Sequence, residues 1–215
     1  MTKFLCLIRH VDSEKNAHEI FDGLNTPQRL TLKGQAEVAK LIPYLETLIE
    51  RNLTALPRLY SANSDRAIQT AQVLEEKLSL KCTPVADLGS MGSGPLAGLS
   101  ETEAKLQFPE YMKTLELYRS GLLSSDKIAR PEGCEALTSY EKRIATCLNR
   151  ILQDGIGGAF VVGHRSPISA ICVSLARRYM GYPEDFFGYI PIPTGSVTLF
   201  NFSEKTFEHV GVLPD

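Results

Sequence analysis

Short apolar runs that stop at polar residues alternate along the chain with longer segments whose apolar residues recur at helical spacing. Residues 4–8 form an uninterrupted apolar run, which is typical of a strand buried on both faces of a parallel sheet. The pattern predicts further short strands at 56–60 and 159–163, and an edge strand near 82–85. Residues 195–202 alternate between apolar and polar positions, which predicts a half-buried strand.

The segments between these strands have the spacing of helices. Thr31 is a candidate N-cap for the first of them, and Pro43 is expected to kink or divide it. Strands separated by helices predict an α/β fold, a three-layer α/β/α sandwich with a mostly parallel sheet. We expect residues 1–215 to form one domain, with a lid insertion at about 87–135. Helices are predicted at 31–51, 65–78, 100–108, 136–153 and 167–179.

Three polar clusters stand directly after predicted strands. Arg9 and His10 follow the first strand, Arg66 closes a polar stretch after the second, and His164 and Arg165 follow the third. Ligands of open α/β sheets bind beyond the carboxyl ends of the strands. Although the clusters are far apart in the sequence, we therefore expect them to converge on one crevice.

Two histidines and several arginines in one crevice are suited to phosphoryl transfer. An arginine fork binds phosphate oxygens bidentately and keeps its charge. An unprotonated histidine can act as a nucleophile, and a second one can donate a hydrogen bond to the phosphoryl group. Because phosphoryl transfer depends on positioning and electrostatic stabilisation, the arginines would remove the need for a metal ion. Taken singly, each residue has an ordinary structural explanation; the three clusters together favour the functional one.

Charge and composition narrow the choice of partners. The formal net charge is −2, with 23 basic and 25 acidic side chains, so nothing favours nucleic acid or an anionic membrane. No apolar stretch approaches the length of a membrane span. The cysteines have no metal-ligand spacing; we expect buried, reduced thiols at Cys6, Cys147 and Cys172, and a cytoplasmic location. No metal and no cofactor are expected, and a monomer and a homodimer both stay open.

Five stretches of the sequence resemble the motifs of one family. Residues 7–13 with Asn16 resemble its Arg-His-Gly motif, and 30–36 its Leu-Thr-x-x-Gly-x-x-Gln segment, shortened by one residue. Residues 61–71 resemble its Ser-x-x-x-Arg-Ala-x-x-Thr-Ala segment, with one extra residue before the arginine. The last two stretches, 161–164 and 193–197, resemble the strand carrying its second histidine and its closing turn. The family is the histidine phosphatase superfamily, also called phosphoglycerate mutase-like, and the resemblance covers nearly the whole chain.

The resemblance implies a phosphoglycerate mutase-like fold and a role for each matching residue. His10 would be the phosphorylated nucleophile. Arg9 and Arg66 would clamp the phosphoryl oxygens, and His164 would donate a hydrogen bond to them. Asn16 would line the same pocket. These five residues form the catalytic and phosphate-binding set that the resemblance implies.

The sequence departs from the family pattern at two positions near these motifs and matches it at a third. Val11 replaces the usual glycine after the histidine, so we expect ordinary extended backbone there, because valine tolerates a positive φ poorly. Arg165 stands where many relatives have a glycine, and two alternatives are open: it contacts the substrate, or it points away and pairs with an acid. Glu135 matches a glutamate of the family, and we expect its role to be more structural than chemical.

The largest departure concerns the general acid. Two glutamates of the matching family stretch are replaced here by Ser90 and Ala97. A serine hydroxyl is too weak an acid to supply an effect that is typically worth about 10²–10⁴-fold. Asp87 is the nearest candidate for the acid, with Glu101 and Glu103 less favoured. Alternatively, the leaving group is good enough to need no acid, or the protein mainly binds its ligand.

These observations predict a metal-independent phosphatase that hydrolyses a phosphomonoester, a phosphoprotein or an acyl phosphate through a phosphohistidine on His10. The short chain and the missing glutamate favour hydrolysis over a mutase reaction, since mutases of this family are usually longer. The alternatives are a catalytically weak or non-catalytic relative that binds a phosphate ligand and, less favoured, a phosphomutase. The expected partner is a small phosphorylated substrate or a phosphoprotein.

Overall fold

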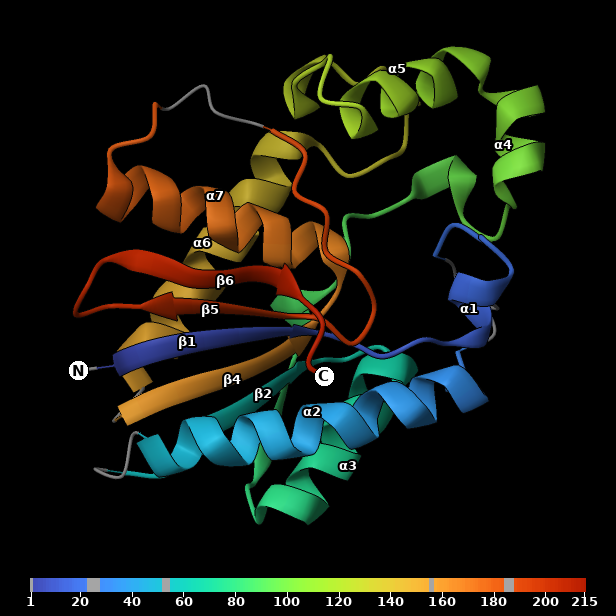
Figure 1. Cartoon of the computed structure of the whole chain (residues 1–215). Helices are drawn as coiled ribbons and strands as arrows, with labels where there is room; N and C mark the ends of the chain where they lie inside the picture. Colours follow the sequence, from blue (N-terminus) through green and yellow to red (C-terminus); the bar gives the residue numbers. More distant parts are fainter. Residues whose placement is uncertain (1, 23–27, 52–54, 155–156, 184–187) are drawn as a thin grey trace.

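The apolar run at the start of the chain forms a central strand of a six-stranded sheet (Figure 1). The computed structural model describes residues 2–22, 28–51, 55–154, 157–183 and 188–215. In spatial order the strands are β3 (Cys82–Val85), β2 (Arg58–Ala62), β4 (Gly157–Gly163), β1 (Thr2–Arg9), β5 (Val197–Asn201) and β6 (Thr206–Val212). The first four are parallel to one another, and β5 and β6 add antiparallel pairs at one side. The prediction of a mostly parallel sheet is confirmed.

Helices cover both faces of the sheet, which confirms the three-layer α/β/α arrangement (Figure 1). α2 (Leu32–Arg51) and α3 (Asp65–Leu78) lie on one face, and α6 (Leu137–Asp154) and α7 (Arg165–Met180) lie on the other. Pro43 lies inside α2 without dividing it. α6 illustrates why these segments are helical, because the side chains it buries in the core recur every three or four residues: Tyr140, Ile144, Cys147, Leu148 and Ile151.

The sequence predicted neither α1 (Glu14–Ala17) nor β6. β6 is an edge strand whose polar residues interrupt any apolar run. Its presence also corrects the expectation that β5 is half-buried, because the first four residues of β5 are fully buried. Phe207 of β6 packs on Phe200 with ring centroids 4.9 Å apart, and the backbone N–H of Gly211 donates to Thr198 Oγ1 at 2.9 Å. β6 therefore shields side chains of β5 that would otherwise be exposed to solvent.

The segment expected as an insertion forms a small layer beyond the carboxyl ends of the parallel strands, close to α1 (Figure 1). A capping box between Ser100 and Glu103 starts the first of its helices. The segment has an apolar cluster separate from the main core, made of Leu96, Ala104, Met112, Leu115 and Ile128. Its elements are η1 (Ala86–Leu88), η2 (Gly94–Leu96), α4 (Glu101–Gln107), α5 (Pro109–Arg119) and η3 (Ser125–Lys127).

The structure also bears on the cysteines and on membrane-spanning helices. Cys6, Cys147 and Cys172 are buried free thiols, as predicted. Within the described ranges, no helix combines the length and the apolar character that crossing a membrane requires.

Candidate active site

The carboxyl ends of the parallel strands bring the three polar clusters into one crevice. Arg9 pairs with Gly163 across the sheet, and the backbone N–H of His10 donates to the carbonyl oxygen of Gly163 at 2.9 Å. The rings of His10 and His164 consequently lie with their centroids 5.2 Å apart. Arg66, in the first turn of α3, places its Nε 3.2 Å from Nε2 of His10. The strand order thus assembles the histidines and Arg66 as the sequence led us to expect.

His10 is held as a neutral imidazole with a defined orientation. Its Nδ1 lies 2.8 Å from the carbonyl oxygen of Val11. Because a carbonyl oxygen only accepts hydrogen bonds, Nδ1 carries the proton, and the lone pair of Nε2 faces the Arg66 guanidinium. Burial lowers the pKa of His10 well below 6.5, and its electrostatic interactions with His164, Arg66 and Arg9 lower it further. The Nε2 lone pair accepts a hydrogen bond from Arg66 Nε–H, and a neutral imidazole with such a lone pair is the form that can attack phosphorus.

Arg66 is almost completely buried and already has a carboxylate partner. Its Nη1 and Nη2 donate to the two carboxylate oxygens of Asp22, at 3.2 and 2.6 Å, and Nη1 also donates to Gln28 Oε1 at 2.9 Å. Burial opposes the ionisation of Asp22, but the hydrogen bonds and charge of Arg66 outweigh it and lower the pKa of that carboxyl. The guanidinium and the carboxylate therefore form a charged pair beside His10.

His164 stands at the N-cap of α7, where β4 passes into the helix. Its Nε2 lies 2.8 Å from the hydroxyl oxygen of Ser64. Burial lowers the pKa of His164 to about 3, and the charge of Arg66 acts in the same direction. A phosphoryl dianion acts in the opposite direction, since negative charge favours the protonated ring. His164 is thus placed to bind such a group as a hydrogen-bond donor.

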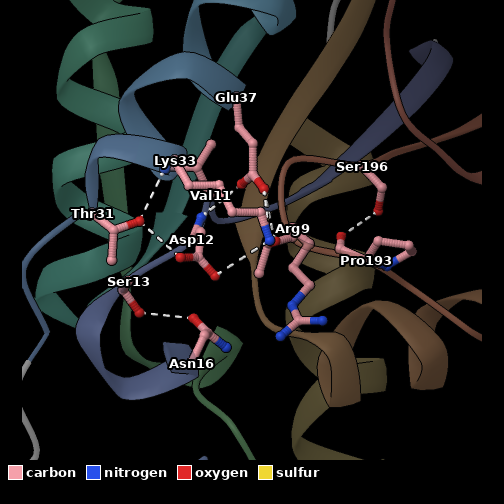
Figure 2. A network of polar contacts seen from close by, with 12 residues as sticks. Arg9, Val11, Asp12, Ser13, Asn16, Thr31, Lys33, Glu37, Pro193 and Ser196 are labelled. Atoms are coloured by element: carbon pink, nitrogen blue, oxygen red, sulfur yellow. Dashed lines mark hydrogen bonds and ion pairs between the residues drawn. The ribbon is translucent and has the colours of Figure 1, made fainter. Parts of the chain in front are cut away.

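Arg9 and Asn16 supply further donors. Arg9 Nη1 donates to the carbonyl oxygen of Ile192 at 2.6 Å, which fixes the direction of the guanidinium. Burial and the charge of Arg165 lower the pKa of Arg9 to about 10, so it stays protonated at neutral pH. Ser13 Oγ donates to Asn16 Oδ1 at 2.7 Å, as Figure 2 shows. The amide N–H groups of Asn16 are then available to a ligand.

The loop that follows β1 is fixed by residues of α2 and its N-cap (Figure 2). Glu37 accepts from the backbone N–H of Asp12 at 2.7 Å and from Thr194 Oγ1 at 3.1 Å. Thr31 accepts from the N–H of Gly34 at 3.1 Å, as an N-cap does, and donates to Asp12 Oδ2 at 2.7 Å. Gly34 approaches the loop so closely that a Cβ there would lie 2.1 Å from the Asp12 carbonyl oxygen. These contacts set the position of the backbone beside the candidate nucleophile.

A cavity of about 270 Å³ lies between these side chains, and positive charge dominates it. Arg119 and Lys15 also line it, together with the carboxylates Glu19 and Glu101. Arg119 pairs with Glu101 at 2.8 Å. Burial, together with the charge of Arg66, lowers the pKa of Lys15 to about 8. The five residues of the set that the resemblance implies line this cavity, and so does Arg165: Arg9, His10, Asn16, Arg66, His164 and Arg165. We call it the phosphoryl pocket.

The phosphoryl pocket suits a small anion carrying two negative charges. Although the net charge of the chain is −2, basic side chains are concentrated in this pocket. Their local positive charge attracts an anionic ligand. In the part of the chain that the structure describes, no three His, Cys, Asp or Glu side chains are grouped so that they could hold a metal ion. The guanidinium and ammonium groups that line the pocket can neutralise the charge of a bound phosphoryl group.

Comparison with known proteins agrees with this geometry. A family model described as histidine phosphatase superfamily (branch 1) matches residues 5–212. The chain belongs to the histidine phosphatase superfamily. A 2,3-bisphosphoglycerate-dependent phosphoglycerate mutase of Bartonella tribocorum is 32% identical over 148 residues. That alignment covers 67% of this chain and 66% of the mutase.

Solved structures with low sequence identity share the fold of this superfamily member. YhfR of Bacillus stearothermophilus has a TM-score of 0.75 at 21% identity, covering 99% of this chain and 96% of that one. A mycobacterial glucosyl-3-phosphoglycerate phosphatase, solved in complex with VO3, has a TM-score of 0.75 at 18% identity, covering 99% of each chain. A putative alpha-ribazole-5'-P phosphatase of Escherichia coli has a TM-score of 0.72 at 18% identity, covering 100% and 97%. These similarities confirm the fold that the motifs implied.

Two positions where the chain departs from the superfamily pattern can now be located. Val11 is buried and is not among the described residues with a positive φ, so its backbone is ordinary, as expected. Arg165 lines the phosphoryl pocket, and its Nη1 lies 3.4 Å from the hydroxyl of Tyr189. No ion pair between Arg165 and an acid occurs within the described residues. Of the two alternatives for Arg165, this placement favours contact with the substrate.

The candidate general acid Asp87 is not among the residues that line the phosphoryl pocket. Its carboxylate pairs with Arg150 of α6, so the structure places this candidate acid outside the pocket. Arg143 holds the same loop by donating to the backbone carbonyl oxygen of Asp87 at 2.6 Å, and it pairs with Glu135 at 2.8 Å. Glu135 therefore makes structural contacts. Ser90, compared above with the missing glutamate, does line the pocket.

Four residues at the site were not predicted from the sequence. Lys15 precedes Asn16 directly, so recognition of the short helix after β1 would have drawn attention to it. Ser64 is the N-cap of α3 and belongs to the same polar stretch as Arg66. Asp22 and Arg119 gave no signal in the sequence, because the first lies in a loop and the second at the end of a helix in the insertion.

Proposed function

We propose that this superfamily member is a phosphatase that hydrolyses a phosphate monoester through a phosphohistidine on His10. The orientation of His10 carries the proposal, because the Nδ1–H bond to Val11 leaves the Nε2 lone pair facing the cations of the pocket. Arg9, Arg66 and Lys15 would supply the positive charge that phosphoryl transfer requires, so we propose that the reaction needs no metal ion.

In the first step, the lone pair of His10 Nε2 attacks phosphorus. A nitrogen–phosphorus bond forms, and the bond between phosphorus and the leaving-group oxygen breaks, with its electron pair passing to that oxygen. Arg9 and Arg66 bind the phosphoryl oxygens, and His164 donates a hydrogen bond to them. Since the transition state is loose, these groups act mainly by holding the reacting atoms in line and stabilising the charge.

In the second step, the oxygen of a water molecule attacks the phosphorus of phospho-His10. The nitrogen–phosphorus bond breaks, and its electron pair returns to Nε2. The protons of the water end on inorganic phosphate and on the departed oxygen, either directly or through solvent. Over the two steps, one phosphate monoester and one water give one hydroxyl compound and one phosphate, and the imidazole is regenerated neutral.

A phosphomutase is the second candidate, and the identity with a phosphoglycerate mutase over 148 residues favours it. A mutase transfers the phosphoryl group from phospho-His10 to a hydroxyl of the substrate instead of to water. Hydrolysis remains the first candidate because Ser90 and Ala97 replace the glutamates that the family pattern carries. Either reaction passes through the same phosphohistidine, so the fate of the phosphoryl group distinguishes them.

The test is to trap the phosphoenzyme and to follow the phosphate. The protein is mixed with a radiolabelled phosphate monoester and quenched in alkali, which preserves phosphohistidine, or in acid, which cleaves it. We expect an acid-labile label, release of inorganic phosphate at an unchanged rate in the presence of EDTA, and loss of both label and release in His10→Gln. His18→Gln, which changes an exposed histidine outside the pocket, is the matched control.

The possible outcomes separate the candidates. Transfer of label between the hydroxyls of a phosphoglycerate without net release of phosphate would establish the mutase. Binding of phosphate by calorimetry without any label would show a non-catalytic relative. An acid-labile label that persists in His10→Gln would place the nucleophile elsewhere and overturn the proposal.

A further inference from the structure

A second cavity adjoins the phosphoryl pocket. It has a volume of about 200 Å³, and Arg119, Arg165 and Ser166 line both cavities. We infer that this second cavity binds an aromatic ring carried by the leaving-group oxygen, so that the preferred substrate is an aryl phosphate. The inference rests on the proposed function and names its substrate class.

Most of the surface of the second cavity is aromatic and apolar, and Arg130, Glu141 and several serines also line it. Tyr111, Tyr118 and Tyr189 line it, and the last two stand edge to face, with ring centroids 5.4 Å apart and planes at 87°. Leu115 and Val173, both buried, add aliphatic surface. An aromatic ring can pack against the edge of one tyrosine ring and the face of another. Since a dry apolar cavity of about 150 Å³ can hold a benzene molecule, a volume of this order accommodates one substituted ring.

The residues at the junction suit a ligand that extends through both cavities. The guanidinium carbon of Arg165 lies 5.8 Å from the ring centroid of Tyr189, and Arg119 is fixed by its ion pair with Glu101. Planar guanidinium groups attract aromatic faces and also bind phosphate oxygens. The hydroxyls of a sugar or glycerol placed against the aromatic and aliphatic part of this lining would lose hydrogen bonds to water.

Two carboxylates in and beside the phosphoryl pocket also favour such a leaving group. Burial opposes the ionisation of Glu101, but Arg119 lowers the pKa of that carboxyl, and Arg66 does the same for Asp22. Carboxylates that are ionised at neutral pH have no proton to donate. A phenol, whose pKa is about 10, leaves with less need of protonation than an alkanol does. An aryl phosphate thus fits the second cavity, and its leaving group has little need of the proton that these carboxylates cannot donate.

Binding of unreactive analogues tests the second cavity separately from the chemistry. Phenylphosphonate and methylphosphonate carry the same anionic head and differ only in the ring. We expect phenylphosphonate to bind the unaltered protein about tenfold tighter or more by calorimetry, since the ring removes apolar surface from water. Equal affinities for the two phosphonates would overturn the inference.

Two variants of α7 locate the ring. Ser169 lines the second cavity, so Ser169→Trp fills it, and the preference for phenylphosphonate should fall to about twofold or less. Ser174 lies on the same helix, is also partly buried and does not line this cavity, so Ser174→Trp is the matched control and should keep the preference. If Ser169→Trp does not fold, Tyr118→Ala replaces it and should also reduce the preference, because it removes an aromatic wall. A folded variant of either kind that keeps the full preference contradicts the inference.

Kinetics with phenyl, benzyl and ethyl phosphate separates the ring from the leaving group. We expect kcat/KM to be highest for phenyl phosphate, which offers both a ring and a weakly basic oxygen. Benzyl phosphate keeps the ring and should have a lower KM than ethyl phosphate. Hydrolysis of all three substrates at equal kcat/KM would overturn the inference, but the proposed phosphatase function would stand. Suppose instead that the protein binds phenylphosphonate selectively but shows neither turnover nor a phosphoenzyme. That result would overturn the proposed function, whereas the inference that the second cavity binds an aromatic ring would stand.

Discussion

The carboxylate of Asp22 binds both terminal nitrogens of Arg66, with Nη1–Oδ1 and Nη2–Oδ2 distances of 3.2 and 2.6 Å. This is the fork geometry in which a guanidinium also binds two phosphate oxygens. The Arg66 side chain is 1% exposed, whereas that of Asp22 is 26% exposed, so solvent reaches the pair only from the side of the acid. A phosphoryl group that approaches Arg66 must therefore displace the carboxylate or share the guanidinium with it.

Removing the charge of Asp22 should strengthen the binding of phosphate analogues. In Asp22→Asn, Arg66 keeps a neutral hydrogen-bond partner but loses a competing anion, and the incoming dianion no longer meets a negative charge. We expect the inhibition constants of vanadate and phosphate to fall about fivefold to tenfold, which corresponds to about 1 kcal/mol of relieved repulsion. Competitive inhibition of aryl phosphate hydrolysis measures both constants.

Asp65→Asn is the control for that experiment, because it removes one negative charge beside Arg66 at an exposed position outside the pocket. It should leave both inhibition constants unchanged within twofold. Weaker inhibition in Asp22→Asn would mean that the carboxylate positions Arg66 for phosphate instead of competing with it.

Lys15 should set a basic limit to the reaction. Because burial and Arg66 lower its pKa to about 8, the ammonium loses its proton as the pH rises through 8, and one cation of the pocket is then lost. We expect kcat/KM to decline above about pH 8 in the unaltered protein. The decline should move to higher pH in Lys15→Arg and disappear in Lys15→Met, whose kcat/KM should be several-fold lower at neutral pH. Lys113→Met, an exposed change on α5, should retain the original profile, and persistence of the decline in Lys15→Met would assign it to another group.

The two buried histidines should make the fold sensitive to mild acid. Burial lowers the pKa of both His10 and His164 below the value of 6.5 for an unperturbed histidine. Below pH 6.5 the unfolded chain binds protons that the folded chain does not, so the free energy of unfolding falls as the pH falls. The slope is at most about 1.4 kcal/mol per pH unit for each histidine, and it vanishes above pH 7. Urea unfolding at pH 7.5 and 5.5 measures this loss, which should be about half as large in His164→Asn; equal stability of the unaltered protein at both pH values would contradict it.

The sequence predicts those site residues whose positions follow from strand order alone. Arg9, His10 and His164 each stand directly after a continuous apolar run, so their convergence needs no knowledge of side-chain packing. Arg66 is fixed almost as directly, since it opens the helix that follows β2. The central parallel sheet is predictable for the same reason, because strands buried on both faces have an uninterrupted apolar pattern.

The residues that the sequence does not reveal depend on tertiary contacts of loops and edges. Asp22 meets Arg66 through a contact between segments that are 44 residues apart in the sequence. Asp87 lies close in sequence to the pocket-lining Ser90, but Arg150, a residue of α6, holds its carboxylate. β6 has no apolar run because one edge of the sheet is exposed there. In each case the position depends on residues that are far apart in the chain, and no local sequence pattern reveals the contact.

Gly34 gives a case in which local propensity and tertiary packing predict opposite effects of one substitution. In an isolated helix, Gly→Ala is stabilising by about 1 kcal/mol. In this fold, a Cβ at Gly34 would lie 2.1 Å from the carbonyl oxygen of Asp12, so the loop after β1 would have to move. Because overpacking of this kind costs about 1–3 kcal/mol, we expect Gly34→Ala to lower the free energy of unfolding and, by shifting the loop next to His10, to reduce kcat. Ala36→Gly, at an exposed site in the same helix, should cost only about 1 kcal/mol in urea unfolding and spare kcat; a stabilised Gly34→Ala would show that helix and loop do not approach so closely.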